Sequence, residues 1–96
     1  GYGAAAKTTT LLNYFGIKNN TIGSIIDDNP LKQNKYTPGT HIPIKSSKHI
    51  YLSKPDYIII LAWNYSNSII KTHEKFFKIG GNFIVPFPKI KIIRDK

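Results

Sequence analysis

The strongest constraint on the fold is the apolar run from Tyr57 to Trp63, which reads Tyr-Ile-Ile-Ile-Leu-Ala-Trp after Pro55-Asp56. The run is short and uninterrupted, and such runs are typical of a strand whose two faces are both buried. A strand of this kind belongs to a parallel sheet that is covered by helices. The sequence therefore predicts an α/β fold, with this strand inside the sheet.

The remaining elements alternate along the chain. Three helices are predicted: one over 4–15 that ends at Gly16, a short one that runs from the Ser46-Ser47 cap to Leu52, and one over 64–79 that Asn64 caps. Further strands are predicted over 22–28, 42–44, 82–86 and 91–93. This order predicts a Rossmann-like, open, mainly parallel sheet flanked by helices. We expect residues 1–96 to be one domain whose first strand is truncated, because the numbering begins inside a loop.

Composition excludes several kinds of site. The 96 residues contain no cysteine, which rules out disulfides and thiolate metal sites in this chain. The net charge is +9, but the lysines are scattered and form no basic arm or aromatic-basic surface, so we expect no nucleic-acid partner. No apolar run reaches the roughly 18 residues of a membrane span, and we expect a cytoplasmic protein without a membrane partner.

The opening loop matches a loose form of the dinucleotide fingerprint, Gly1-x-Gly3-x-x-Ala6. Asp27 and Asp28 follow at about the distance where an acidic residue binds ribose hydroxyls in such folds. Two structural alternatives remain open. Small residues at a loop–helix junction can serve packing alone, and one of the two acids can simply start the turn at Asn29-Pro30.

Two other segments carry groups that could bind a ligand. The long irregular segment 29–44 offers cations, amides, hydroxyls and an imidazole, which suit phosphate, sugar and base contacts. Within it, Pro38-Gly39 predicts a type II turn, and His41 lacks a second ligand for a metal. Trp63 and Asn64 stand at the carboxyl end of the buried strand, where ligands bind in open sheets, although Trp63 could equally belong to the core. The sequence shows no Ser–His–Asp, Cys–His or paired-carboxylate apparatus.

A group of motifs resembles one known family. Spread over nearly the whole chain are Gly1-Tyr2-Gly3-Ala4-Ala5-Ala6-Lys7, Leu11-Leu12-Asn13-Tyr14, Asp27-x-Asn29-Pro30-x-Lys32-Gln33, Pro38-Gly39-Thr40-His41-Ile42-Pro43-Ile44, and Pro55-Asp56-Tyr57 with Leu61-Ala62-Trp63-Asn64. Together they resemble the C-terminal domain of S-adenosylmethionine-dependent sugar C-methyltransferases, which methylate a carbon of a nucleotide-linked ketodeoxysugar. The chain departs from the family pattern at Thr8 or Thr9 and at Asn34, where a glycine is expected.

The resemblance implies that the chain is part of a three-part enzyme. A zinc-binding N-terminal domain and a middle domain that holds most of the S-adenosylmethionine site would precede it, and zinc would be confined to the former. The parent enzyme would remove a proton beside the sugar keto group, and the enolate carbon would attack the methyl sulfonium. This domain would help to bind the nucleotide-linked deoxysugar and close the cleft without catalytic residues of its own, unless His41 serves as the base.

The resemblance also assigns the residues that would line the nucleotide-sugar cleft, with Lys7 and Lys32 as phosphate partners. They are Gly1, Tyr2, Gly3, Ala4, Lys7, Asp27, Asn29, Lys32, Gln33, Thr40, His41, Trp63 and Asn64. Two alternatives stay open: an independent NAD-type nucleotide-binding domain, favoured by the loose fingerprint, and a basic non-catalytic interaction module, favoured by charge alone.

Overall fold

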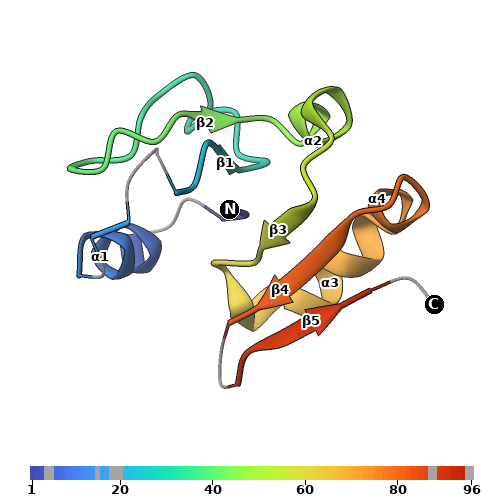
Figure 1. Cartoon of the computed structure of the whole chain (residues 1–96). Coiled ribbons are helices and arrows are strands. Elements are labelled where there is room, and N and C mark those ends of the chain that lie inside the picture. The colour runs from blue at the N-terminus through green and yellow to red at the C-terminus, as the bar shows by residue number, and fades with distance from the viewer. Residues whose placement is uncertain (4–5, 15, 18–20, 87–88, 95–96) are drawn as a thin grey trace.

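The fold was obtained as a computed structural model, which describes residues 1–3, 6–14, 16–17, 21–86 and 89–94 (Figure 1). Helices and strands alternate through these segments. In chain order they are α1 (Ala6–Tyr14), β1 (Ile25–Ile26), β2 (Ile44–Lys45), α2 (Lys48–Ser53), β3 (Tyr57–Ile59), the 3₁₀ turn η1 (Trp63–Tyr65), α3 (Ser66–Thr72), α4 (Lys75–Lys78), β4 (Asn82–Val85) and β5 (Lys91–Ile93). The protein is therefore α/β. None of the helices in the described segments is long and apolar enough to cross a membrane.

The strands pair mainly in parallel. β1 pairs with β2 and β3 with β4, both in parallel, while β5 runs antiparallel to β4. Tyr2 links the two groups of strands, because it forms parallel bridges to Ile26 of the first group and to Ile60 just after β3. The segment from Gly1 to Gly3 thus lies between β1 and β3, where Figure 1 marks the N-terminus.

Two apolar cores lie on opposite sides of these strands, since successive side chains of a strand alternate between its faces. One core joins Tyr2, Ile26, Ile58 and Ile60 to α2 and α4 through Ile50, Phe76 and neighbours. The other joins Ile25 and Leu61 to α1 through Leu12. Bridged residues fall in the same core, as expected when neighbouring strands are in register. The helices cover both faces of the strands, as the run from Tyr57 predicted.

Most of the predicted elements are confirmed, some of them shorter than expected. Gly16 has φ +65 and follows α1 as predicted. The prediction of one helix over 64–79 is wrong: the segment forms η1, α3 and α4, and Asn64 lies inside η1 instead of capping a helix. The break falls at His73, whose backbone leaves the helical region at φ −114 and ψ 37. Its ring there forms hydrogen bonds to two tyrosines, described below.

Candidate functional site

Three neighbouring chain segments end together at the carboxyl edge of the parallel strands. These ends are Gly3 in the middle, Asp27 after β1, and Ala62 after β3. Gly3 has φ +104, and a Cβ placed on it would lie 2.7 Å from the Cβ of Ala62. A side chain at position 3 would therefore be strained and would collide with the end of β3. In this structure Gly3 therefore allows the central segment to pack closely against the end of β3, which is the packing role that the sequence left open for the small residues of the opening loop.

Asp27 starts the turn that leaves β1. The carboxylate oxygen Oδ1 of Asp27 accepts a hydrogen bond from the backbone N–H of Asn29 at 2.8 Å. Asn29 repeats the pattern, because its Oδ1 accepts from the N–H of Leu31 at 3.0 Å. The amide Nε2 of Gln33 donates to the Asp27 carbonyl oxygen at 2.9 Å. The structure therefore brings Asp27, Asn29 and Gln33 together, and Asp27 starts the turn, which is the structural alternative that the sequence left open for one of the two acids.

Asp28, the neighbour of Asp27, ends a buried hydrogen-bond network that the sequence did not predict. The Tyr2 hydroxyl donates to Oδ2 of Asp28 and lies 2.9 Å from Nε2 of His73. On the far side of the imidazole, Nδ1 of His73 lies 3.1 Å from the Tyr51 hydroxyl. Tyr2 and His73 are only 5% and 6% exposed. The network links the central segment, β1, α2 and the end of α3, whose residues are far apart in the sequence.

The network has one consistent direction of donation. Burial lowers the pKa of the His73 imidazole, although the nearby Asp28 carboxylate opposes this shift, so the ring is neutral at pH 7. Burial, with the hydrogen bond to Asp28, raises the pKa of the Tyr2 phenol. With Tyr2 donating to Asp28, the neutral ring donates from Nε2 to the Tyr2 oxygen and accepts at Nδ1 from Tyr51. Every donor thus points toward Asp28, which fixes the orientation of an exposed carboxylate at the carboxyl edge.

The turn at Pro38-Gly39 forms next to α1. Gly39 has φ +77, which fits the predicted type II turn, and a Cβ on it would lie 2.6 Å from Oδ1 of Asn13. The Nδ2 amide of Asn13 donates to the Pro38 carbonyl at 3.3 Å. Thr40 is buried and its hydroxyl bonds that of Thr37, which in turn accepts from the N–H of Ile42. Thr40 therefore stabilises the turn from within.

His41 follows that turn on the outside of the molecule. The residue is exposed, has φ +54, and its ring centroid lies 5.9 Å from that of Tyr36. A positive φ is uncommon for a residue with a side chain, so the turn holds His41 in a strained conformation. The imidazole is accessible to a ligand, and among the described residues no group of three potential metal ligands forms around it or elsewhere.

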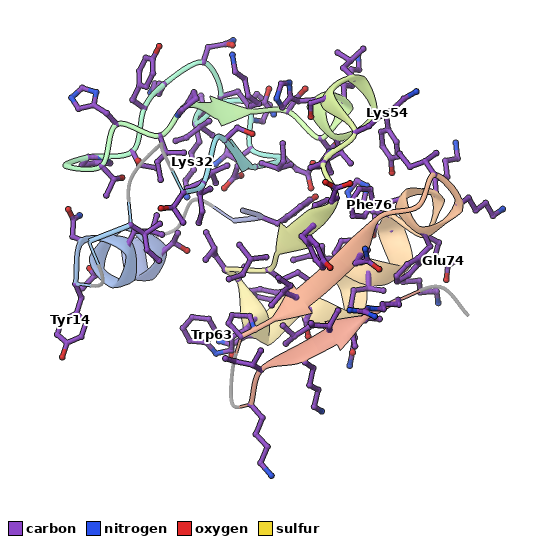
Figure 2. The ribbon with its side chains drawn as sticks, viewed as in Figure 1. Tyr14, Lys32, Lys54, Trp63, Glu74 and Phe76 are labelled. Atoms are coloured by element: carbon purple, nitrogen blue, oxygen red, sulfur yellow. The ribbon has the colours of Figure 1, made fainter. Side chains whose placement is uncertain are left out.

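The other predicted site residues are dispersed. Trp63 is half-buried and packs against the core that contains Tyr2, in agreement with the alternative that this side chain belongs to the core. Asn64 is exposed. In the view of Figure 2, Lys32 lies on the side of β1 and β2, and Trp63 lies beyond the end of β3. Gly1 lies at the start of the central segment, where its terminal amine donates to the Ser24 carbonyl at 2.9 Å. Ala4 and the Lys7 side chain lie outside the described part of the structure.

A hollow of about 780 Å³ lies beside Gly1. Its lining is mainly apolar and comes from the segments before β1 and β3, from the strands themselves, and from α2, which adds the polar side chains of His49 and Ser53. Among the predicted site residues that the structure describes, only Gly1 lines the hollow. We therefore take as the candidate ligand site the carboxyl edge of the strands, where Asp27, Asn29 and Gln33 lie.

The geometry defines an α/β domain with ligand-type groups at the carboxyl edge of parallel strands, and comparison with known proteins gives its family. Residues 1–88 match the family described as the C-methyltransferase C-terminal domain, and the chain belongs to this family. The chain is 42% identical over 93 residues to C-methyltransferase NovU of Streptomyces niveus. The match covers 97% of this chain and 22% of that relative, so the chain spans about a fifth of its length.

Proposed function

We propose that this chain is the C-terminal domain of an enzyme that methylates a carbon of a nucleotide-linked ketodeoxysugar with S-adenosylmethionine. The observation that carries the proposal is the match of residues 1–88 to the C-methyltransferase C-terminal domain family. A relative that is named a C-methyltransferase and is 42% identical supports the same activity. The chain acts in this proposal as a substrate-binding wall that helps to close the cleft.

We propose further that the fold is Rossmann-like. The bridges of Tyr2 give the strand sequence β2, β1, the Gly1–Gly3 segment, β3, β4 and β5 across the molecule. Counted from the central segment, this is the order 3-2-1-4-5-6 of dinucleotide-binding folds. In such sheets the chain leaves the central strand on one side and continues on the other, and ligands bind at the carboxyl ends there. Gly3, Asp27 and Ala62 stand at this place, which supports a nucleotide-sugar site.

In this site, the cationic and polar groups of the turn after β1 contact the nucleotide-sugar. Lys32 belongs to the turn in which Asp27, Asn29 and Gln33 are joined by hydrogen bonds, and in this proposal its ammonium is a phosphate partner. Asp28, aligned by Tyr2, adds a fixed carboxylate that can accept hydrogen bonds from sugar hydroxyls. His41 is an accessible donor from the neighbouring turn.

The cofactors of the enzyme are assigned elsewhere in this proposal. The chain has no cysteine, and its described residues contain no cluster of three potential metal ligands, so they do not fit a zinc site. In this proposal, zinc belongs to the N-terminal domain, as the family resemblance implies. S-adenosylmethionine supplies the methyl group, and its binding site is assigned mainly to the middle domain of the full-length enzyme.

The test is to titrate the full-length enzyme with a deoxythymidine diphosphate-sugar and to measure amide hydrogen exchange. We expect slower exchange in residues 27–33. The variant Lys32→Ala should weaken nucleotide-sugar binding by about 1 to 2 kcal/mol, as for a charge-assisted hydrogen bond, and Lys48→Ala, on α2, should not. Tight NAD binding without a nucleotide-sugar response would favour the NAD-type domain. Salt-dependent binding of single-stranded oligonucleotide would favour the basic interaction module.

A further inference from the structure

Asp28 differs from its neighbour Asp27 in the acceptor capacity that it leaves for a ligand. Asp27 uses Oδ1 within its own turn, where this atom accepts from the Asn29 N–H at 2.8 Å. Asp28 is exposed, and within the described part of the chain its carboxylate has one hydrogen-bond partner, the Tyr2 hydroxyl. A carboxylate has two oxygens with about four lone-pair positions, so most of the acceptor capacity of Asp28 is open to solvent.

The Tyr2 hydroxyl serves Asp28 only while His73 does not take its proton. A phenol carries a single proton, and the Tyr2 oxygen lies within hydrogen-bond distance of Asp28 and, at 2.9 Å, of Nε2 of His73. If Nε2 carried no proton, it would accept from Tyr2 and compete with Asp28. With a proton on Nε2, the ring donates to the Tyr2 oxygen and leaves the phenol proton for Asp28. The tautomer of His73 therefore decides whether Asp28 receives a hydrogen bond.

The ionised carboxylate selects one tautomer of His73. A charged acceptor forms the stronger hydrogen bond, so the Tyr2 proton goes to Asp28, and the Tyr2 oxygen then accepts from Nε2. The other ring nitrogen, Nδ1, is left as an acceptor 3.1 Å from the Tyr51 hydroxyl, which donates to it. In this arrangement each group has a partner, and the described side chains include no buried nitrogen or oxygen without one.

We propose that Tyr2 and His73 are positioning residues, which act on the nucleotide-sugar only through Asp28 and hold this carboxylate as the acceptor for one hydroxyl of that ligand. The inference rests on the proposed function, since it concerns the same ligand at the same edge of the strands. Tyr2 fixes Oδ2 of Asp28 from the core, so Oδ1 is presented to the ligand in one orientation.

An acceptor at this position selects the group that the ligand presents. A carboxylate accepts hydrogen bonds and repels a phosphate, so the ligand group beside Asp28 is a hydroxyl, while the phosphates belong with Lys32. Such a site discriminates against an analogue without the hydroxyl, because the carboxylate would lose water and gain no partner. A deoxythymidine diphosphate-sugar offers this chemistry from two sources, the 3′-hydroxyl of its deoxyribose and the hydroxyls of its hexose.

Tyr2 contributes by ordering Asp28 before the ligand binds. An exposed aspartate without a partner is free to rotate about its side-chain bonds, and a ligand would have to immobilise it. The Tyr2 hydroxyl, which His73 holds in turn, has already done so. Because ordering one side chain on binding costs about 2- to 10-fold in affinity, this is the loss that we expect when the Tyr2 hydroxyl is removed.

The experiment measures the affinity of the full-length enzyme for a deoxythymidine diphosphate-sugar by calorimetry. Tyr2→Phe should weaken binding about 2- to 10-fold, and Asp28→Ala about 10-fold or more. Because Tyr2 acts through Asp28, adding Tyr2→Phe to Asp28→Ala should cause no further loss. The matched controls are Tyr57→Phe and Asp56→Ala, two exposed residues where β3 begins, and both should leave the affinity unchanged.

Additive losses in the double variant would overturn the proposal, because Tyr2 would then affect the ligand without Asp28, for example through the stability of the fold. Wild-type affinity in Asp28→Ala would overturn it as well. Either result is distinct from failure of the proposed function, in which the wild-type enzyme itself does not bind the nucleotide-sugar.

Ligand analogues identify which hydroxyl Asp28 binds, and they need no substitution at Tyr2. If Asp28→Ala weakens the binding of deoxythymidine diphosphate but not of its 3′-deoxy analogue, the partner is the deoxyribose hydroxyl. If it weakens only the binding of the complete nucleotide-sugar, the partner is a hydroxyl of the hexose. Either result supports the proposal, whereas a loss that is equally large for the diphosphate and its 3′-deoxy analogue would contradict a hydroxyl partner.

The role of His73 has a spectroscopic test in the wild-type enzyme. Imidazole ¹⁵N NMR, with the His73 signals identified by their absence in His73→Gln, should show the proton of the neutral ring on Nε2. A proton on Nδ1 would overturn the proposal, because Tyr2 would then donate to His73 and leave Asp28 without its positioning hydrogen bond.

Discussion

Removal of the Tyr2 hydroxyl tests the buried network most sharply. In Tyr2→Phe the ring keeps its place in the core, but the hydroxyl no longer bonds Asp28 and His73. Asp28 is exposed, so water replaces the Tyr2 hydroxyl as its hydrogen-bond partner, and the loss of stability at this carboxylate is small. His73 is buried, and its Nε2 donor is left without this partner, which costs about 1 to 3 kcal/mol on top of about 1 kcal/mol for the lost bond. We expect the free energy of unfolding to fall by about 2 to 4 kcal/mol.

The assay is urea unfolding followed by far-ultraviolet circular dichroism, with a thermal scan alongside. For a domain of this size each kcal/mol corresponds to about 4 to 8 °C in Tm. The control is Tyr65→Phe, because Tyr65 is 68% exposed and should change stability by less than about 0.5 kcal/mol. If Tyr2→Phe is as mild as this control, the network does not stabilise the fold and the argument for an aligned Asp28 fails.

Three further predictions follow from the packing and the titrating groups. Gly3→Ala should lower the free energy of unfolding by about 1 to 3 kcal/mol, because φ +104 and the contact with Ala62 both oppose a side chain. The control Gly23→Ala should leave the free energy of unfolding nearly unchanged, because a Cβ on Gly23 would have no atom within 4 Å. Urea unfolding measures both variants. Phe76→Ala should cost about 3 to 5 kcal/mol by the same assay, because Phe76, on α4, is fully buried against Phe83 of β4, and a loss below about 1 kcal/mol would refute its place in the core. The third prediction concerns pH: stability should fall as the pH drops below 6.5, because burial lowers the pKa of His73, so that the unfolded imidazole binds a proton in this range and the folded one does not. Urea unfolding at a series of pH values measures this effect, and a stability that stays constant between pH 7 and 5 would contradict a buried, neutral His73.

The sequence predicted the fold well where one segment carries the signal. The run from Tyr57 predicted a strand and Gly16 predicted the end of α1, because burial on both faces and a left-handed φ each favour particular residues at the position itself. No local sequence pattern indicated the break of the helix at His73, since the break coincides with hydrogen bonds to Tyr2 and Tyr51, which are distant in the sequence.

The candidate site was predictable only in part, for the same reason. The sequence left open that one of the two acids starts the turn at Asn29-Pro30, and Asp27 does so, because its partner Asn29 is only two residues away. The selection of Asp28 as the carboxylate aligned by Tyr2 depends on a pairing across 26 residues that no local pattern records. The family resemblance assigned Thr40 to the cleft, but Thr40 is buried and its hydroxyl bonds that of Thr37, so its contact with a ligand stays a prediction.

We propose that this domain belongs to an enzyme that methylates a carbon of a nucleotide-linked ketodeoxysugar. The most direct measurement incubates the full-length enzyme with S-adenosylmethionine carrying a ¹³C-labelled methyl group and a deoxythymidine diphosphate-ketodeoxysugar, and locates the label in the product by NMR. We expect a methyl group bonded to a ring carbon beside the keto position, and a lower rate in Lys32→Ala than in Lys48→Ala. A methyl group on oxygen or nitrogen, or no transfer to any nucleotide-sugar, would contradict it.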